Sequence, residues 1–583
     1  MKLEDQDIVV QDIDNLGIIA GIIDKMHLVE LIDTLMPPHQ LEIVTTGMAV
    51  KAMILNCMGF LTSPLYLFSK FFEDKPVEHL LGKNIQSKHL NDSRLGRALD
   101  EVYQYGVTKL FLKIALQIVS IFNIDTSYLH ADTTSLSVHG KYQNKKSSKD
   151  GVNVSETVEE LQEEKDNEEP YPIEITYGYS RDHRPDLKQF TMGLITNGGQ
   201  GIPVMMTIKD GNESDKQHFQ KIMKDFVNQW DGSKMNFFVM DSGAYSAENI
   251  REWQCTKWII RAPRSIRLVV DLIESTKEDD LKTIDKDPRY KILEVDGEYA
   301  GINQRWFLVQ SEPRRQSDIE DLDKTIAKEN KQKNKDLEKL NAKGFACEAD
   351  AFQALDKFNK ELKYHTVKDN EIISKPQYSS PGRPVKGQEP SHYRYYIEGG
   401  IIANEDVISI HKNKAGRFVL ASNCLDKQSL SGEDALFRYK DQQGTERGFR
   451  FIKDPIFFAS SVFLKNTSRI MALTMIMALA LMVYALGEKE LRDSLEKAED
   501  TVPNQKGKPT SRPTLRWTFQ CFQSVHLIIV NGVKSFVDIK KMQKTFLKFL
   551  PPECQRYYFL TGMDPGHPSD EYNNLGLTGI ATG

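Results

Sequence analysis

The chain has 583 residues, which is too long for one compact core, so we expect about three or four folding units. Apolar residues make up 40% and charged residues 27%, the composition of an ordinary folded protein rather than a disordered one. The formal net charge is −6, which argues against nucleic-acid binding through overall charge. Binding depends on local patches, however, so the net charge does not exclude it.

The cysteine pattern and the start of the chain both indicate a reduced compartment. The cysteines are Cys57, Cys255, Cys347, Cys424, Cys521 and Cys554. None of them forms a C-x-x-C pair, so neither a zinc site nor a disulfide framework is predicted. The first residues, MKLEDQDIVVQDID, are acidic and lack the apolar stretch of a secretory signal. We therefore expect a cytoplasmic protein.

Residues 1 to about 120 show helical spacing of apolar residues. Asn91 and the two polar residues after it offer N-cap side chains for a helix that follows. Two interpretations of this unit remain open. It is either a packing or dimerisation domain, or a domain that recognises DNA ends through basic residues such as Arg94 and Arg97.

From about residue 125 the pattern changes to short strands and helices. The expected elements are a strand in TSYLHADTTSLSVHG, two strands in ITYGYSRDHRPDLKQFTMGLITNGGQGIPVMMTI, a helix at 214–229, the strand MNFFVMD, a helix at 247–254 and the strand KWIIRAP. Three early strands followed by alternating elements predict a mixed α/β sheet. Gly198–Gly201 reads as a turn and not as a phosphate loop, because no helix with GK[ST] follows it.

The block from about 264 to 425 looks like an insertion into that sheet domain. Asp296–Gly297 predicts a hairpin turn between two strands. Residues 317–362 are dense in charge and predict an exposed helical hairpin. We expect strands to return over 392–411 and over 416–423.

Helices resume over 432–496, and a basic linker, PNQKGKPTSRPTLRW, leads to a small C-terminal unit. Residues 470–486 contain no charged residue, but a membrane span needs about 20 such residues. We interpret them as a helix in a protein core, with a membrane span as the alternative. The predicted domains are an N-terminal helical domain (1–120), a catalytic core in two parts (121–263 and 426–500), an insertion (264–425) and a C-terminal region (501–583).

Two aspartates follow apolar strand residues. Asp132 comes after the strand residues 128–131, and Asp241 directly follows the strand 237–240. A carboxylate at such a place is costly unless it is hydrogen-bonded or binds a cation, and hard oxygen ligands suit Mg²⁺ or Mn²⁺. The alternative is that each aspartate caps a turn or helix, Asp241 through the Ser242–Gly243 turn.

A third carboxylate lies in the segment ALFRYKDQQGTERGFRFIK. Glu446, Arg450 and Lys453 are spaced to share one face of a helix, and Tyr439 joins them if the helix is unbroken. Two interpretations are open. The face is an ordinary solvated one, or Glu446 is a metal ligand beside cationic groups that hold phosphates.

This segment resembles the signature helix of the insertion-sequence DDE transposases of family four. Their pattern is Tyr, two residues, Arg, three residues, Glu, six residues, Lys. Tyr439, Glu446 and Lys453 match it, whereas Gln442 stands at the arginine position. HADTTSLSVHGKY and VMDSGAYSAENI are similar to the segments around the first and second aspartates of these enzymes, and NLGIIAGIIDKMHLVELID to a helical domain that precedes the core in one subgroup.

The resemblance implies an α/β (α+β) fold: an RNase H-like, mixed five-stranded sheet with flanking helices. A β-rich insertion would lie between the fifth strand and the Glu446 helix. It implies that Asp132, Asp241 and Glu446 are both catalytic and metal-binding, holding two Mg²⁺ (or Mn²⁺) ions, and that Tyr439 and Lys453 contact DNA. We add Arg450 as a DNA contact because it shares their helix face.

The implied reaction is metal-dependent hydrolysis of phosphodiester bonds at transposon ends, followed by strand transfer into target DNA. The expected partners are double-stranded DNA, both terminal inverted repeats and target, and a second copy of the chain on that DNA; a membrane is not expected. The expected place is the prokaryotic cytoplasm, at the nucleoid.

Two other interpretations stay open. The chain is alternatively a stand-alone nuclease on the same core, or a transposase-derived DNA-binding protein that no longer cleaves DNA. The departure at Gln442 gives some support to the second, and three intact carboxylates argue against it. His130, His139 and His183 have no partner pattern of a catalytic triad, so we interpret them as structural or DNA-facing.

Overall fold

A computed structural model describes the protein over residues 8–59, 68–138, 172–178, 184–213, 226, 237–379, 383, 388–453, 466–531, 533–536 and 539–558. His139, His183 and most of the helix expected at 214–229 lie outside these residues. The chain divides into two compact units, one of residues 1–258 and 438–583 and one of residues 259–437. Each unit is described by itself.

The first unit begins with a helical part, as the apolar spacing predicted. Its helices are α1 (Leu16–Lys25), α2 (Leu28–Leu35), α3 (Thr46–Met58), α4 (Phe68–Phe71), α5 (Val77–Leu81), α6 (Asp92–Tyr105) and α7 (Val107–Ile121). The predicted cap at Asn91 is confirmed, because its side chain accepts a hydrogen bond from the Arg94 backbone N–H. The faces that these helices bury form a continuous apolar core.

The sheet of the first unit contains four strands in the order β4-β3-β2-β5. They are β2 (Tyr128–Val138), β3 (Lys188–Asn197), β4 (Pro203–Lys209) and β5 (Phe237–Met240). β3 runs antiparallel to both β2 and β4, whereas β5 runs parallel to β2. The helix α9 (Ala247–Glu252) follows β5, and β6 (Lys257–Ala262) begins in this unit. The expected α/β class with a mixed sheet is thus confirmed.

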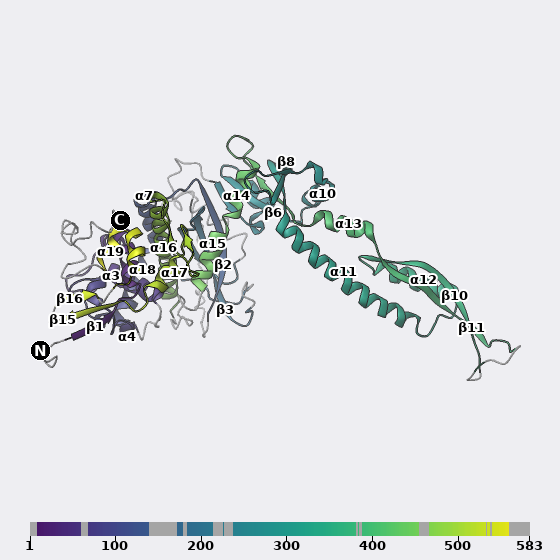
Figure 1. Cartoon of the computed structure of the whole chain (residues 1–583), viewed down its shortest axis with the longest axis horizontal. Helices are drawn as coiled ribbons and strands as arrows, with labels where there is room; N and C mark the ends of the chain where they lie inside the picture. Colours follow the sequence, from purple (N-terminus) through teal and green to yellow (C-terminus); the bar gives the residue numbers. More distant parts are fainter. Residues whose placement is uncertain are drawn as a thin grey trace, which may run out of the picture. The chain divides into compact units, whose positions relative to one another are not determined.

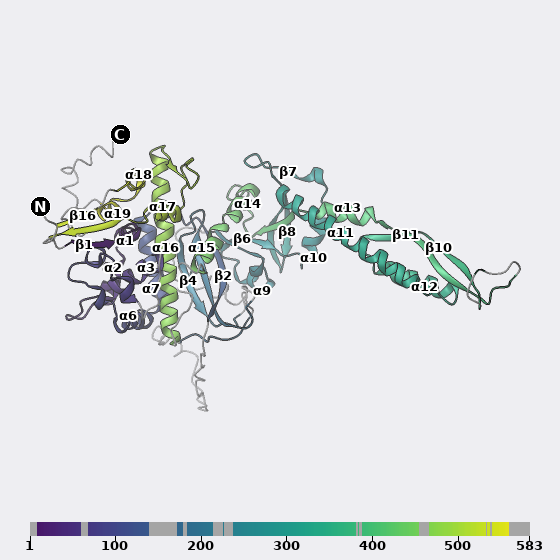
Figure 2. The same ribbon diagram turned by 60° about the horizontal axis from the view of Figure 1, so that its bottom comes forward.

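The charge-free segment forms part of α16 (Thr467–Lys497), which contacts α1, α3, α6, α7 and β4. Figure 2 shows this helix running between the N-terminal helices and the strands of the first unit. It is long and apolar enough to cross a membrane, but 89% of its most apolar window is buried inside the protein. That burial agrees with the expectation of a core helix.

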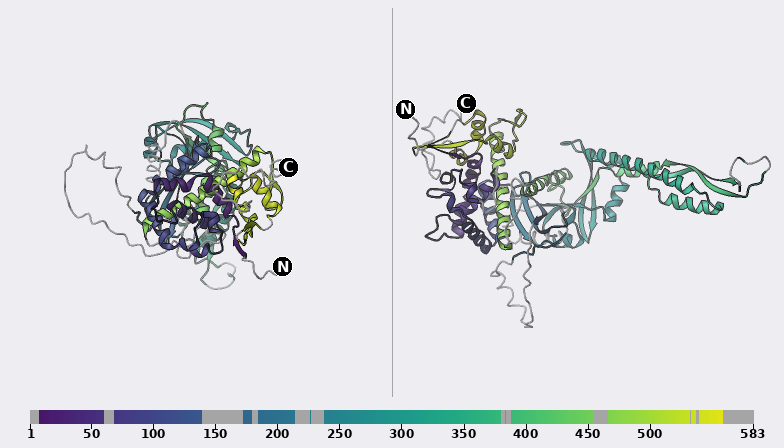
Figure 3. Two further views of the ribbon diagram at one scale, coloured as in Figure 1. Left: turned by 90° about the vertical axis from the view of Figure 1, so that its left-hand side faces the viewer. Right: turned by 90° about the horizontal axis from the view of Figure 1, so that it is seen from below.

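The C-terminal elements pack against the N-terminal ones, which the sequence did not predict. β1 (Ile8–Asp12) pairs with β15 (His526–Val530), and β15 pairs with β16 (Val533–Phe536). Helix α19 (Pro552–Arg556) lies so close to α1 that a Cβ on Gly21 would meet the Cys554 backbone at 2.4 Å. Figure 3 shows the C-terminal elements (yellow) against the N-terminal ones (purple). The remaining elements there are β13 (Val502–Pro503), β14 (Pro509–Thr510), α17 (Leu515–Cys521) and α18 (Lys541–Phe549).

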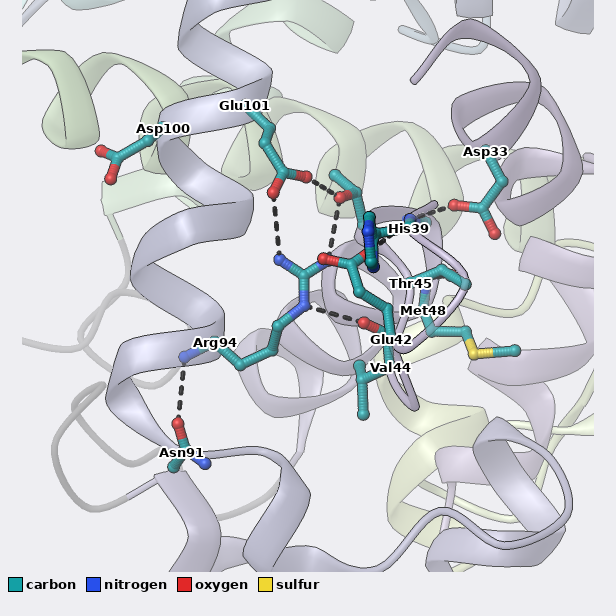
Figure 4. A network of polar contacts seen from close by, with 12 residues as sticks. Asp33, His39, Glu42, Val44, Thr45, Met48, Asn91, Arg94, Asp100 and Glu101 are labelled. Atoms are coloured by element: carbon teal, nitrogen blue, oxygen red, sulfur yellow. Dashed lines mark hydrogen bonds and ion pairs between the residues drawn. The ribbon is translucent and has the colours of Figure 1, made fainter. Parts of the chain in front are cut away.

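Arg94 does not present its charge to a ligand. Its side chain is buried and donates hydrogen bonds to the Val44 carbonyl at 2.8 Å and to the Thr46 hydroxyl at 3.0 Å. It also forms an ion pair with Glu101 at 3.3 Å (Figure 4). The proposed DNA-contacting role of Arg94 is therefore wrong, because this guanidinium holds α6 to the start of α3. Arg97, in contrast, is exposed.

The second unit has its own run of strands in the order β6-β12-β9-β8-β7. The new strands are β7 (Lys282–Thr283), β8 (Tyr290–Tyr299), β9 (Ile302–Ser311) and β12 (Arg417–Ser422), with α10 (Arg267–Ser275) beside β12. The predicted turn at Asp296–Gly297 is wrong. Both residues lie inside β8, and the turn is Ala300–Gly301, with φ of 59° and 81°. Gly297 is needed in the strand, since a Cβ there would lie 2.8 Å from the Trp306 indole.

The predicted charged helical hairpin is confirmed as α11 (Glu312–Asn341) and α12 (Glu348–Lys360). In Figure 1 both helices run beside a long β-hairpin of β10 (His365–Gln377) and β11 (His392–Ala403). The hairpin and the helices share a small apolar core that includes Leu355, Phe358 and Ile397. β10 was not predicted, and the strand expected up to residue 411 ends at Ala403, since Asn404 caps helix α13 (Glu405–Lys414).

Candidate active site

The two aspartates stand on neighbouring parallel strands of the first unit. Ala131 of β2 pairs with Met240 of β5, so Asp132 and Asp241 are the next residues on the two strands. β5 ends at Met240, whereas β2 continues to Val138. Asp132 therefore lies inside its strand, at the level where the neighbouring strand stops. The sequence placed the two carboxylates at one sheet edge, and the strand register agrees with that placement.

Neither aspartate caps a helix through its side chain. Asp241 occupies the N-cap position of a short 3-10 helix, Ser242–Ala244, but makes no side-chain cap hydrogen bond there. Asp132 accepts a hydrogen bond from the Thr133 backbone N–H at 2.7 Å within the strand. The alternative interpretation holds for the Asp241 backbone, whose carbonyl accepts a hydrogen bond from the Ala244 N–H at 3.0 Å, but the Asp241 side chain takes no part in that cap.

Glu446 lies on α15 (Gln443–Lys453), a helix held against the sheet by its opposite face. Phe449 and Ile452 are buried, and the Thr445 hydroxyl is hydrogen-bonded to the Thr196 hydroxyl of β3 at 2.6 Å. This anchoring leaves the face that carries Glu446 outward.

Glu446, Arg450 and Lys453 share that outer face, as their spacing predicted. The Glu446 and Arg450 side chains are exposed and form an ion pair at 4.0 Å. Lys453 is half-buried at the end of the helix. Two cationic side chains therefore accompany the carboxylate on one side of α15.

Tyr439 does not share this helix. α14 (Gly432–Lys440) ends before α15 begins, and the backbone N–H of Gln442 is hydrogen-bonded to the Tyr439 carbonyl at the break. The same-face argument for Tyr439 is therefore wrong, because it required an unbroken helix. The Tyr439 hydroxyl instead donates a hydrogen bond to Asp241 Oδ1 at 3.3 Å. Tyr439 thus joins the site through the second aspartate.

Gln442, at the position of the signature arginine, is buried, and its carbonyl accepts hydrogen bonds from the backbone N–H groups of Thr445 and Glu446. It directly precedes α15, and its carbonyl forms the first hydrogen bonds of that helix. Arg438 lies on α14. Its guanidinium carbon is 5.3 Å from the centre of the Tyr128 ring and 4.8 Å from the centre of the Phe237 ring. Its charge is thus held within the protein by aromatic faces.

His130 is a core residue. It is fully buried two positions before Asp132, and neither ring nitrogen has a hydrogen-bond partner among the described residues. Burial lowers the pKa of His130 to about 4, so the ring is neutral near pH 7. Of the two open interpretations, the structural one applies to this histidine.

Two contacts of the site were not anticipated. The Tyr128 hydroxyl donates a hydrogen bond to Asp441 Oδ2 at 2.8 Å. Burial, with the Asp441 hydrogen bond and charge, raises the pKa of Tyr128 above its ordinary value, so the hydroxyl keeps its proton. The second unanticipated contact is the hydrogen bond between the Thr196 and Thr445 hydroxyls. No local pattern predicts either contact, because both join residues far apart in the chain.

The donor set suits a hard divalent cation, since it consists of three carboxylates and no sulfur or imidazole ligand. In the part of the chain that the structure describes, however, no three acidic, histidine or cysteine side chains lie close enough together to hold a metal ion. Asp241 instead contacts Tyr439, and Glu446 contacts Arg450. The three carboxylates have the chemistry of a metal site, and the strand register places two of them side by side. In this structure, however, the three are not gathered around one metal position.

Comparisons with known proteins give matches over most of the chain. Residues 131–483 match the family described as "Transposase DDE domain", and residues 8–116 match a domain of unknown function (DUF4277). No curated protein matches. Among solved structures, the chain is similar to the cryo-EM structure of the piggyBac transposase synaptic complex with hairpin DNA. The identity is 8% and the TM-score 0.33, over 81% of this chain and 73% of that chain.

Proposed function

Because the chain belongs to the transposase DDE domain family and is a DNA transposase, we propose that it mobilises a prokaryotic insertion sequence, with Asp132, Asp241 and Glu446 as its catalytic carboxylates. The insertion-sequence branch is supported by the spacing of Tyr439, Glu446 and Lys453 in the sequence. The proposed reaction is cut-and-paste transposition in the prokaryotic cytoplasm, at the nucleoid. Its partners are terminal inverted repeats and target DNA, bound by a dimer of the chain.

An RNase H-like core for this enzyme is supported by the topology of the first unit. Three antiparallel strands, β2, β3 and β4, are followed by β5 parallel to β2. After α9 the chain enters a further strand, β6, which would be the fifth. In this proposal residues 264–425 are the insertion that separates the second aspartate from Glu446.

The observation that carries the proposal is the parallel register of β2 and β5. Side chains at the same level on adjacent parallel strands lie on the same face. Asp132 and Asp241 hold that relation, because Ala131 pairs with Met240 directly before them. α15, with Glu446 on it, contacts β2 and β3. Three segments distant in sequence thus bring one carboxylate each to one region of the first unit.

Asp132, Asp241 and Glu446 would hold two Mg²⁺ or Mn²⁺ ions. Bound divalent ions neutralise charge at the phosphoryl group and lower the pKa of an attacking hydroxyl. Glu446 has to exchange its Arg450 contact for this role, and an exposed pair at 4.0 Å exchanges at little cost. The Tyr439 hydroxyl bond restrains the rotation of the Asp241 carboxylate.

Arg450 and Lys453 are proposed to contact DNA phosphates from the same helix face as Glu446. A released Arg450 is placed to pair with a phosphate, since guanidinium groups bind phosphate oxygens with two parallel hydrogen bonds. The strand to be cut would then lie along the outer face of α15, with Arg450 one turn and Lys453 two turns from the carboxylate.

The reaction we propose has two steps. Water attacks the phosphorus atom at the transposon end, the bond to the 3′ oxygen breaks, and that oxygen takes a proton to become a 3′-hydroxyl. The 3′-hydroxyl then loses its proton and attacks a phosphorus atom of the target strand, releasing a new 3′-hydroxyl there. The first step leaves a 5′-phosphate on the flanking strand, and the second breaks one phosphodiester bond while it forms another, so strand transfer needs no external energy source.

The test uses Asp132→Asn, Asp241→Asn and Glu446→Gln, which keep the side-chain shapes and remove the charges. The substrate is a duplex with the terminal sequences that flank this reading frame. Each variant should lose Mg²⁺-dependent cleavage to background while it still binds the duplex. Glu248→Gln is the matched control, since Glu248 is an exposed carboxylate on α9. Cleavage at the wild-type rate by any of the three would remove that residue from the site.

A second readout separates the enzyme from an inactive DNA-binding descendant, which the buried Gln442 at the arginine position favours. Calorimetric titration with Mn²⁺ should give binding to the wild type that Asp132→Asn weakens. An inactive descendant would bind DNA but show no difference between the two titrations. Joined products from a 3′-hydroxyl donor strand separate a transposase from a stand-alone nuclease.

A further inference from the structure

The long helix α11 of the second unit has its charges divided along its length. Its first part, residues 312–323, contains two arginines and five carboxylates, a net charge of −3. The rest of the helix, residues 324–341, contains six lysines and three carboxylates, a net charge of +3. This excess of positive charge stands in a chain whose formal net charge is −6. The proposed function gives the helix no role.

Four lysines of the positive part form a single row along the helix. With 3.6 residues per turn they fall within an arc of about 80° around the helix axis. All four are exposed, whereas the opposite side of α11 packs through Leu337 and Leu340 against the small apolar core. We call these four residues the lysine stripe: Lys328, Lys331, Lys335 and Lys339.

The lysine stripe has no carboxylate partner among the described residues, since none of its four ammonium groups forms an ion pair or a hydrogen bond there. Two of the three carboxylates in this part of the helix are engaged elsewhere. Glu329 pairs with His365 at 2.8 Å, and Asp336 accepts a hydrogen bond from Gln332 at 3.0 Å. The third, Glu338, is exposed beside the stripe. Four positive charges therefore have one carboxylate near them.

The lysine stripe does not hold the helix together. In the first part of α11, Arg314 pairs with Asp318 one turn later at 2.8 Å, and such opposite charges stabilise a helix. In the stripe, Lys331, Lys335 and Lys339 follow one another at the same four-residue spacing. Like charges at this spacing destabilise a helix by a similar amount. The stripe therefore costs stability unless something outside the helix neutralises it.

The helix dipole does not explain the lysine stripe either. Cations are favoured in the last turn of a helix, beside its unpaired carbonyl groups, and the effect fades beyond that turn. α11 ends at Asn341, so Lys339 lies in its last turn, whereas Lys328 lies more than three turns before the end. Regularly spaced positive charges without internal partners are the arrangement that a polyanion neutralises.

We propose that the lysine stripe binds the phosphate backbone of duplex DNA without regard to its sequence. This inference rests on the proposed function and adds a DNA contact in the second unit. From Lys328 to Lys339 the helix rises about 17 Å, and duplex DNA of that length carries about ten phosphates. Lysine side chains are flexible point charges, which suits phosphates better than base edges. The stripe also explains how an acidic chain holds DNA, because binding follows local charge.

The test measures DNA affinity by fluorescence anisotropy of a labelled duplex at several salt concentrations, in EDTA so that no cleavage occurs. The stripe variant combines Lys328→Gln, Lys331→Gln, Lys335→Gln and Lys339→Gln. The slope of log K against log salt should fall by about three, and the affinity roughly thirtyfold, since each phosphate contact contributes about 0.9 to the slope. The loss should be equal for a duplex with the terminal sequences and for an unrelated duplex, because phosphates carry no sequence information.

Two further variants serve as controls. A matched variant removes four other exposed lysines of the second unit, through Lys282→Gln, Lys357→Gln, Lys368→Gln and Lys427→Gln. It changes the net charge equally and should keep affinity and slope near wild type. Arginine at all four stripe positions keeps the charges and should bind as the wild type does. The stripe variant should melt at the wild-type temperature or higher in low salt, because repulsion between its lysines is removed.

Three outcomes would overturn this proposal. Wild-type affinity and salt slope in the stripe variant would exclude the contact. Equal losses in the matched control would assign the effect to total charge. A loss confined to the duplex with the terminal sequences would indicate contacts to bases. If the stripe variant melts lower than the wild type, the four changes are made singly, and an unchanged slope in each folded single variant also overturns it. Failure of the catalytic proposal would appear separately, as a wild type that binds DNA without cleaving it.

Discussion

The strand side and the helix side of the candidate site are built differently. Asp132 lies within β2 and Asp241 directly follows β5, so the paired register of these two parallel strands sets their backbone positions. Glu446 stands on a helix that begins directly after the turn at residues 441–442 between α14 and α15, and its side chain is exposed. Backbone hydrogen bonds between strands set the positions of the two aspartates, whereas side-chain contacts set the position of α15.

This difference shows where the site is adjustable. Register in a sheet with buried faces is costly to change, because a one-residue slip exposes every buried side chain. A helix held by side-chain contacts, such as the Thr196–Thr445 hydroxyl pair and the Phe451–Tyr484 ring contact, can shift by a fraction of an ångström at lower cost. We infer that α15, and not the sheet, sets how closely the third carboxylate approaches the two aspartates.

The largest expected effect comes from moving α15 through the glycine turn. Gly201 has φ of 70°, and a Cβ there would lie 3.1 Å from the Gly444 carbonyl at the start of α15. Gly201→Ala combines strain with a push on the helix, so we expect a loss of about 2–4 kcal/mol in the free energy of unfolding. Cleavage should fall with it, although no proposed catalytic residue is changed. Urea unfolding and the cleavage assay measure the two effects.

Gly199→Ala is the control for that experiment. Gly199 also has a positive φ, 79°, but the nearest atom to a Cβ there is the Tyr128 hydroxyl at 3.8 Å. The substitution should cost only the backbone strain, about 1–2 kcal/mol, and leave cleavage by the folded protein close to wild type. Equal cleavage losses in the two variants would contradict the view that α15 is the adjustable side.

A smaller effect is expected from the hydroxyl pair that anchors α15. Thr445→Val keeps the shape of the side chain but leaves the buried Thr196 hydroxyl without this partner, at a cost of about 1–3 kcal/mol. Thr196→Val together with Thr445→Val should recover part of that loss, because both polar groups are then gone. A double-mutant cycle of unfolding free energies measures the coupling. Additive losses would show that the pair does not anchor the helix.

The sequence predicted the strand side well. Each strand of the core is a short apolar run ended by polar residues, and an aspartate directly after such a run needs a partner or a cation. The position of Asp241 follows from this local logic, whereas Asp132 lies inside β2, which continues to Val138. The register that places the two aspartates side by side does not follow from it, because it depends on pairing between strands more than 100 residues apart.

The helix side was predicted only in part. The one-face spacing of Glu446, Arg450 and Lys453 is a local property and was correct. Whether the helix runs unbroken from Tyr439 was left open, since KDQQG continues a helix as readily as it ends one. At the interruption Asp441 accepts a hydrogen bond from Tyr128, a tertiary contact that no local pattern predicts. The wrong hairpin turn at Asp296–Gly297 has the same cause: turn chemistry was read locally, and the packing of Gly297 on Trp306 decided the register.

The smallest effect should come from Tyr439, which connects the two sides. Tyr439→Phe removes a hydroxyl that donates to Asp241 at 3.3 Å near the surface, so stability should change by less than about 1 kcal/mol. Asp241 then loses one restraint, and we expect cleavage to fall by roughly tenfold, the scale on which partners of metal-binding side chains act. Tyr128→Phe removes a shorter bond, to Asp441 at 2.8 Å, which does not involve a proposed catalytic residue. That variant should lose more stability than activity. If Tyr128→Phe loses cleavage and Tyr439→Phe does not, the Tyr439 hydroxyl does not position Asp241. The strand register alone would then set the position of that carboxylate.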